Sequence, residues 1–236
     1  MNKKLLPLIV TILAIPASQA ATTLPFGFSN IRFQPNGNVN MGATFTFVSN
    51  TTPSDPEPLP NDSNSTAPEI TANFILTADF DGDATNDTLT FGLTATAVAP
   101  TDSTLFLNTN GIAGIGNVFL DVGESINYTV SVGEVVTSSG DEFAASFDGF
   151  TGGAFGNFDV GESYNANGQV FTTSTFDFVD SEGTLVPSET LLLTGVSGAA
   201  FTTGFDFGIT VEAVPEPSST ALLGLGALAF LARRRR

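Results

Sequence analysis

Residues 69–98 read EITANFILTADFDGDATNDTLTFGLTATAV and contain two alternating segments separated by an acidic turn. Polar and apolar side chains alternate over residues 71–80 and again over residues 88–98. Because successive side chains of a β-strand point to opposite faces of a sheet, this alternation predicts two half-buried strands. The Asp- and Gly-rich residues between them favour a turn, so the stretch predicts a hairpin.

Similar segments recur on both sides of this hairpin, and turn residues separate them about every ten positions, as in sandwiches and barrels. The core has an evident source in 22 Phe, because the chain has only two Tyr and no Trp. Without Cys the fold has no disulfide to stabilise it. We therefore predict an all-β fold, a single antiparallel β-sandwich of jelly-roll or immunoglobulin-like type. Further strands are expected at residues 44–48, 104–107, 117–120, 125–132, 142–147, 169–178, 191–194 and 204–214.

Residues 50–68 interrupt the pattern with five prolines among Ser, Asn, Thr and Asp. A segment with so little to bury is expected to be a loosely ordered surface loop. Too few residues precede it for an independent domain. We therefore place it inside one domain that spans residues 21–213.

The acidic turn of the hairpin contains the one group of residues with an evident chemistry. Its carboxylates come from Asp79, Asp81, Asp83 and Asp87, and Gly82 allows a tight turn. Carboxylates this close repel one another unless a hard cation neutralises them, and Ca²⁺ binds six to eight such oxygens. The spacing resembles the calcium loops of FG-GAP-type repeats and, more loosely, an EF-hand loop. It departs from both at Ala84 and lacks the EF-hand's last Glu, so we expect a structural Ca²⁺ site without either family's fold. The alternative is a solvated acidic turn.

A short repeat adds a second turn signal: residues 121–127 read DVGESIN and residues 159–165 read DVGESYN. The first copy leads directly into an alternating segment and is similar to the turn that introduces a strand in bacterial immunoglobulin-like domains. Gly supplies permissive backbone angles, and Ser or Asp side chains are expected to bond nearby amides. We favour this turn interpretation over a ligand-binding role for Glu124 and Glu162.

The C-terminal region has three parts in a fixed order: residues 214–219 (VPEPSS), an apolar run at residues 221–232, and four arginines. The prolines keep the chain extended. The apolar run is shorter than the roughly 20 residues of a stable span, and the arginines stay on the cytoplasmic side. These features predict a short transmembrane helix that anchors the chain transiently until an enzyme cuts it.

This arrangement resembles the PEP-CTERM sorting signal of Gram-negative bacteria. The resemblance implies recognition by an exosortase, a membrane-embedded enzyme similar to cysteine proteases, in bacteria that make exopolysaccharide. It covers residues 214–236, and its site residues are Val214, Pro215, Glu216, Pro217, Arg233, Arg234, Arg235 and Arg236.

The N-terminus predicts export. Lys3 and Lys4 precede an apolar run at residues 5–15, and small residues follow at 18–20. This is typical of a secretory signal peptide at residues 1–20, cut between Ala20 and Ala21 and handled by the Sec machinery.

The region between the two signals is strongly acidic. Arg32 is its only cation among the seven Lys and Arg of the chain, against 23 of the 24 acidic residues, which gives 1 − 23 = −22. Such a body repels nucleic acids and anionic lipids and attracts divalent cations. We exclude nucleic-acid binding and expect Arg32 to pair with a nearby carboxylate.

Catalytic residue types are nearly missing from the chain. His and Cys are absent from the sequence, and the exported region has no Lys, which excludes triad, thiol and Schiff-base chemistry. Carboxylate-based glycoside hydrolysis remains, but sugar clefts normally stack rings on Trp or Tyr. We therefore predict a non-catalytic protein.

The sequence thus predicts a secreted or cell-surface protein of the outer membrane or extracellular matrix, released after transient inner-membrane anchoring. Its role would be structural or interactive and linked to exopolysaccharide or biofilm. Two alternatives stay open: a Ca²⁺-dependent carbohydrate-binding module and, less favoured, a carboxylate-based glycosidase.

Overall fold

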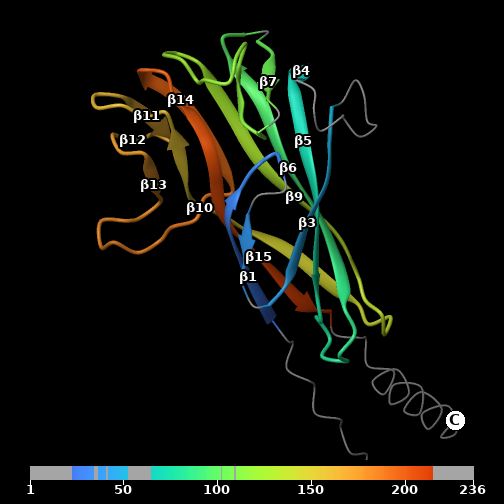
Figure 1. Ribbon diagram of the computed structural model, residues 1–236. Helices are drawn as coiled ribbons and strands as arrows, with labels where there is room; N and C mark the ends of the chain where they lie inside the picture. The colour runs from blue at the N-terminus through green and yellow to red at the C-terminus, as the bar shows by residue number, and fades with distance from the viewer. Residues whose placement is uncertain are drawn as a thin grey trace, which may run out of the picture. The chain divides into compact units, whose positions relative to one another are not determined.

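The structure, a computed structural model, describes residues 23–34, 37–40, 42–52, 65–101, 103–108 and 110–214. These residues form fifteen strands and no helix (Figure 1). The strands are β1 (Thr23–Ile31), β2 (Asn38–Val39), β3 (Thr44–Thr51), β4 (Ser65–Ala67), β5 (Glu69–Ala78), β6 (Asp87–Ala99), β7 (Leu105–Leu107), β8 (Ala113–Ile115), β9 (Ser125–Val136), β10 (Phe143–Gly156), β11 (Ser163–Ala166), β12 (Gln169–Phe171), β13 (Thr175–Asp177), β14 (Thr190–Ser197) and β15 (Phe201–Ala213).

The strands form three antiparallel sheets. A seven-stranded sheet has the order β12-β11-β14-β9-β6-β5-β3, and a five-stranded sheet has the order β13-β10-β15-β1-β2. A small sheet has the order β4-β7-β8. The expected all-β class and antiparallel pairing are confirmed.

The hairpin of residues 69–98 forms as predicted from β5 and β6. Ile70, Phe74 and Leu76 alternate with half-buried residues along β5, and Phe74 lies opposite Phe91 of β6. The buried side chains share one face, which is the face that a period of two residues predicts. The last pair of this register is Ala78 opposite Asp87. The strand pairing therefore fixes which residues form the acidic turn.

Aromatic rings connect the two larger sheets. Phe28 of β1 packs against Phe91 of β6 with ring centroids 5.1 Å apart, and Tyr128 of β9 packs against Phe205 of β15 at 4.5 Å. Rings at these separations interact favourably beyond the area that they bury. The inward side chains of both sheets therefore share one phenylalanine-rich core.

Two strand predictions are wrong. Residues 117–119 form bends rather than a strand, because Asn117 Oδ1 accepts the Phe119 N–H at 2.6 Å and holds a turn. The expected strand at 169–178 is divided into β12 and β13, which belong to different sheets. The chain crosses between the sheets at residues 172–174, and alternation alone does not reveal such a crossing.

The proline-rich loop is shorter than predicted. Strand β3 continues to Thr51 and Ser65–Ala67 forms β4, so both ends of the 50–68 segment pair with other strands. Residues 53–64 lie outside the described residues, as do the predicted signal peptide with its Ala20–Ala21 cleavage site and the predicted C-terminal helix. Within the described ranges no helix is long and apolar enough to cross a membrane.

Candidate functional site

The sorting signal predicted from the sequence begins directly after the last strand. Strand β15 lies between β1 and β10 in the five-stranded sheet, so its backbone is paired on both sides (Figure 1). Val214 follows it and donates its N–H to the Glu142 carbonyl at 2.8 Å. Of the eight predicted signal residues, only Val214 is described. The described backbone therefore reaches the residue before Pro215.

The acidic turn brings together three of its four predicted metal ligands. Carboxylate oxygens of Asp79, Asp81 and Asp87 lie within 4.8 Å of one another. Asp83 is outside this group, and its side chain accepts from the Thr85 N–H at 2.6 Å and the Ser138 hydroxyl at 2.9 Å.

Asp87 connects the acidic turn to a second loop. It is 1 % exposed, and its carboxylate accepts the Phe80 N–H at 2.8 Å and the Ser138 N–H at 2.9 Å. Ser139 extends the connection by donating its hydroxyl to Asp81 at 2.6 Å. The loop between β9 and β10 is thus fastened to the turn between β5 and β6 by carboxylates.

The donor set fits a hard divalent cation. Oxygen ligands on opposite sides of a Ca²⁺ ion are about 4.8 Å apart, because each bond is about 2.4 Å long. Asp79 already accepts the Gly82 and Ala84 amides, at 2.6 and 3.0 Å, but each carboxylate oxygen keeps a further lone pair. Asp79, Asp81 and Asp87 would be the residues to hold Ca²⁺, and the ion would neutralise them.

The repeated DVGE segments form the same turn twice. In the first, Glu124 N–H donates to Asp121 O at 3.0 Å, while Asp121 N–H donates back to the Glu124 carboxylate at 2.8 Å. In the second, Glu162 and Asp159 make the same two bonds, at 3.2 and 2.8 Å. The turn interpretation is confirmed, but the bonding side chain is Glu and not the expected Ser or Asp.

Both turns serve the same end of one strand. They introduce β9 and β11, the two neighbours of β14, and Gly195 of β14 exchanges backbone bonds with Gly123 and Glu124. In the second turn, Glu162 also accepts the Ala199 N–H at 2.9 Å. The first turn therefore bonds the end of β14, and the second turn bonds the connection between β14 and β15. Both Glu side chains have a structural role.

Two side chains of the repeated segments, Glu124 and Tyr164, have pKa values above their ordinary ranges. Burial raises the pKa of Glu124, and the hydrogen bond from the Asp121 amide only partly opposes it. Burial also raises the pKa of Tyr164, whose hydroxyl accepts from the Ala200 amide and donates to the Leu120 carbonyl. Both effects are consistent with a turn that is packed against the β14–β15 connection.

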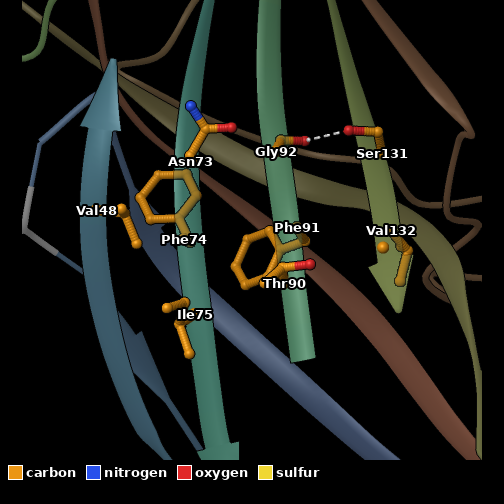
Figure 2. Close-up of a pocket in the computed structure, with 10 residues that line it drawn as sticks. Val48, Asn73, Phe74, Ile75, Thr90, Phe91, Gly92, Ser131 and Val132 are labelled. Carbon is orange, nitrogen blue, oxygen red and sulfur yellow. Dashed lines mark hydrogen bonds between the residues drawn. The ribbon is translucent and has the colours of Figure 1, made fainter. Parts of the chain in front are cut away.

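A shallow groove of about 340 Å³ lies across β3, β5, β6 and β9 (Figure 2). Gly92 and Gly133 form part of its lining, and the Ser131 hydroxyl donates to the Gly92 carbonyl at 3.5 Å. The lining carries hydroxyl, amide and apolar groups and no ionisable side chain. The lining residues are Val48, Asn73, Phe74, Ile75, Thr90, Phe91, Gly92, Ser131, Val132 and Gly133.

Sequence reasoning missed the partners of the acidic turn and of Arg32. Ser138 and Ser139 lie more than fifty residues from the carboxylates that they bond, so spacing could not identify them.

The Arg32 guanidinium donates to Asn30 Oδ1 at 3.4 Å. Its Nε is buried without a hydrogen-bond partner, and no carboxylate of the described residues pairs with it. The expected ion pair is therefore wrong within those residues.

The comparisons with known proteins concern the C-terminus. The family model for the PEP-CTERM protein-sorting motif matches residues 213–236. Neither the curated proteins nor the solved structures gave a match to the chain. The chain carries a PEP-CTERM sorting motif that begins at the last residue of its last strand, and this motif marks it as an exported protein that an exosortase, a membrane protein, processes.

Proposed function

We propose that residues 21–213 form a non-catalytic β-sandwich, of jelly-roll or immunoglobulin-like type, with a structural or interaction role at the cell surface or in the extracellular matrix. Signal peptidase would release residues 1–20 after export through the Sec machinery. A short transmembrane helix within residues 214–236 would hold the chain at the inner membrane until the exosortase acts. An association with exopolysaccharide or biofilm in a Gram-negative host belongs to the same proposal.

One observation carries this proposal: the sorting motif starts at residue 213, where β15 ends. The motif is therefore attached directly to a paired strand and would be presented just outside the folded body. The apolar run begins only a few residues later, and an extended chain spans at most about 3.5 Å per residue. The body would thus stay close to the membrane until it is released.

The test uses the chain in its host. In the Glu216→Ala variant, we expect the intact C-terminus to be retained and the protein to stay in the membrane fraction. The matched control is Glu212→Ala, which removes an exposed carboxylate of β15 outside the motif and should be processed normally. Peptide mass spectrometry of the exported protein reads both outcomes. A tetra-arginine terminus on the released wild-type protein would contradict the proposal.

The non-catalytic role is supported by composition and by the groove. The exported region has no His, Cys or Lys, and the groove lining has no Asp or Glu. A glycosidase needs two carboxylates flanking the scissile bond, roughly 5 to 9 Å apart. The groove supplies none, which favours binding over hydrolysis there.

A Ca²⁺-dependent carbohydrate-binding module is the second candidate, and the gathering of Asp79, Asp81 and Asp87 favours it. Ca²⁺ would be a structural cofactor in this case. We expect Asp81→Asn to abolish any Ca²⁺-induced rise in melting temperature, while Asp83→Asn keeps it, because Asp83 is outside the group. A glycan array with and without Ca²⁺ then tests sugar binding itself. A melting temperature that does not respond to Ca²⁺ or to a chelator excludes the site.

A further inference from the structure

A row of five threonines crosses the outer face of the seven-stranded sheet, on strands β3, β5, β6, β9 and β14. The register pairs Thr51 with Thr71, Thr71 with Thr94, Thr94 with Thr129 and Thr129 with Thr190. Residues directly opposite each other share one face of a sheet, so the five side chains lie on the same side. All five are half-buried or exposed, which places the row on the face away from the core. At about 4.8 Å between strands, the row is about 19 Å long.

The groove lies beside this row on the same face. Gly92 of β6 is opposite both Asn73 of β5 and Ser131 of β9, so no side chain stands between that amide and that hydroxyl (Figure 2). A Cβ built on Gly92 would lie 3.0 Å from Ser131 Oγ and 3.1 Å from Thr71 Cγ2, so the depression adjoins the threonine row. Thr90, two residues before Gly92 on β6, is exposed and lines the same groove. The bare glycine therefore opens a depression that is rimmed by hydrogen-bonding groups.

The groups around the depression can both donate and accept hydrogen bonds. Thr and Ser hydroxyls do both, and an Asn amide offers one oxygen and an NH₂ group. Val48 and Ile75 place apolar surface beside them. A sugar ring has the same division, because its hydroxyls surround the ring while its C–H groups form the two ring faces. The lining therefore matches a ligand rich in hydroxyl groups.

The groove also discriminates against charged ligands. The acidic residues of strands β3, β5, β6, β9 and β14 are Glu69, Asp87 and Glu134, and none of them lines the groove. The lining has no Lys or Arg to pair with a carboxylate or phosphate, and the charge of −22 on residues 21–214 repels acidic polymers. An uncharged ligand meets neither obstacle.

We propose that this groove and the adjoining threonine row bind an uncharged polysaccharide chain, which rests on the interaction role proposed above and gives that role a ligand class. Threonine favours strands in general, so the row alone would not define a site. The depression at Gly92, with an amide on one side and a hydroxyl on the other, is the second feature. Both Tyr of the chain are buried and Trp is absent, so hydrogen bonds and not ring stacking would hold the sugars.

Binding at this groove does not need the acidic turn. Asp87 lies five residues before Gly92 on β6, which corresponds to about 17 Å along a strand. A cation held by Asp79, Asp81 and Asp87 would therefore not reach a sugar at Gly92. This separates the site from a Ca²⁺-dependent one and gives the two different responses to a chelator.

Affinity electrophoresis of the protein as its host exports it tests the ligand class. The negative charge drives migration, and a polysaccharide in the gel retards only a protein that binds it. We expect retardation by at least one of three neutral polymers (dextran, hydroxyethyl cellulose and galactomannan), unchanged by EDTA and stronger than retardation by the acidic polymer alginate. No retardation by the neutral polymers, or equal retardation by alginate, overturns the proposal. Retardation that EDTA abolishes also overturns it and assigns sugar binding to the acidic turn.

Variants at exposed positions test the location. The double variant Thr90→Val/Ser131→Ala removes two hydroxyls from the groove, and we expect it to raise the apparent dissociation constant at least about fivefold. The matched control is Thr175→Val, an exposed threonine of β13 in the five-stranded sheet, which should bind as the wild type does. Equal binding by the double variant and the control contradicts the site. Peptide mass spectrometry of the same exported proteins checks C-terminal processing, so failure of the polysaccharide site is distinguished from failure of exosortase sorting.

Discussion

At the scale of single residues, Asp87 shows how a candidate metal ligand also holds the fold. Its buried carboxylate accepts one backbone amide from each of two loops that are far apart in the sequence. Asp81 and Asp79 are more exposed and bond only within their own turn or to Ser139. Removing a charge therefore has different consequences at positions that the sequence pattern treats as equivalent.

We predict that Asp87→Asn lowers the free energy of unfolding by about 1–3 kcal/mol. An amide side chain has one acceptor oxygen, so one of the Phe80 and Ser138 amides would face its NH₂ group. The control Asp83→Asn is exposed and should change stability by less than about 0.5 kcal/mol. Urea unfolding measures both. Equal losses would show that the buried bonds of Asp87 are not the cause.

The raised pKa of Glu124 predicts that the folding stability depends on pH. Because burial raises the pKa of Glu124, its ionised form is disfavoured in the folded state. Its contribution to stability is therefore largest below its ordinary pKa and is lost as the pH rises through the raised folded value. We expect the stability of the wild type relative to Glu124→Gln to fall between pH 4 and pH 7, followed by denaturant unfolding. A relative stability that rises with pH would mean that the Asp121 amide outweighs burial.

At the scale of elements, β14 depends on a close approach to the first DVGE turn. A Cβ built on Gly195 would overlap the Asp121 carbonyl oxygen and backbone. Gly183 lies in open space at φ +82°, so a substitution there tests backbone conformation alone. The two glycines thus separate a steric requirement from a conformational one.

We predict that Gly195→Ala destabilises the fold by about 1–3 kcal/mol or more, because backbone atoms cannot move aside as a flexible side chain can. Gly183→Ala should cost only about 1 kcal/mol, which is the penalty of a left-handed alanine. Thermal unfolding of both variants compares the two costs. If Gly183→Ala were the more damaging, the turn would not be pressed against β14 as described.

The same scale shows what the sequence could predict. Strands β5 and β6 alternate cleanly over many residues and were predicted within a few positions. Strand β1 was missed, because Pro25 and Gly27 argue against a strand. At Pro25, β1 has a neighbouring strand only on the β15 side, because β2 pairs only with Phe28 and Ser29. A proline, which has no N–H to donate, is tolerated at such an edge position.

The acidic turn has a similar explanation. Its spacing predicted that carboxylates gather there, and three of the four do so. Asp83 lies outside the group, and Ser138 and Ser139 of the β9–β10 loop bond Asp83, Asp87 and Asp81. Local spacing identifies residues that can meet within one turn, whereas the serines that bond these carboxylates come from a loop more than fifty residues away in the sequence.

At the scale of the whole molecule, residues 21–214 combine a large apolar core with a charge of −22 and one cation. The core supplies the driving force for folding, and the charge opposes compaction through self-repulsion. Arg32 offsets little of this repulsion, since it is one positive charge against 23 acidic residues and pairs with no carboxylate of the described residues. Solvent cations are therefore expected to contribute to stability.

We accordingly predict that raising NaCl from about 0.02 M to 0.5 M increases the melting temperature by roughly 3–6 °C, because the Debye length shortens from about 20 Å to about 4 Å and the repulsion between distant carboxylates is screened. CaCl₂ at equal ionic strength separates this screening from specific binding. If Asp79, Asp81 and Asp87 hold Ca²⁺, the calcium salt should give an extra rise that Asp81→Asn removes and Asp83→Asn keeps. Differential scanning calorimetry measures all three proteins, and a melting temperature that falls with NaCl would contradict self-repulsion as the opposing force.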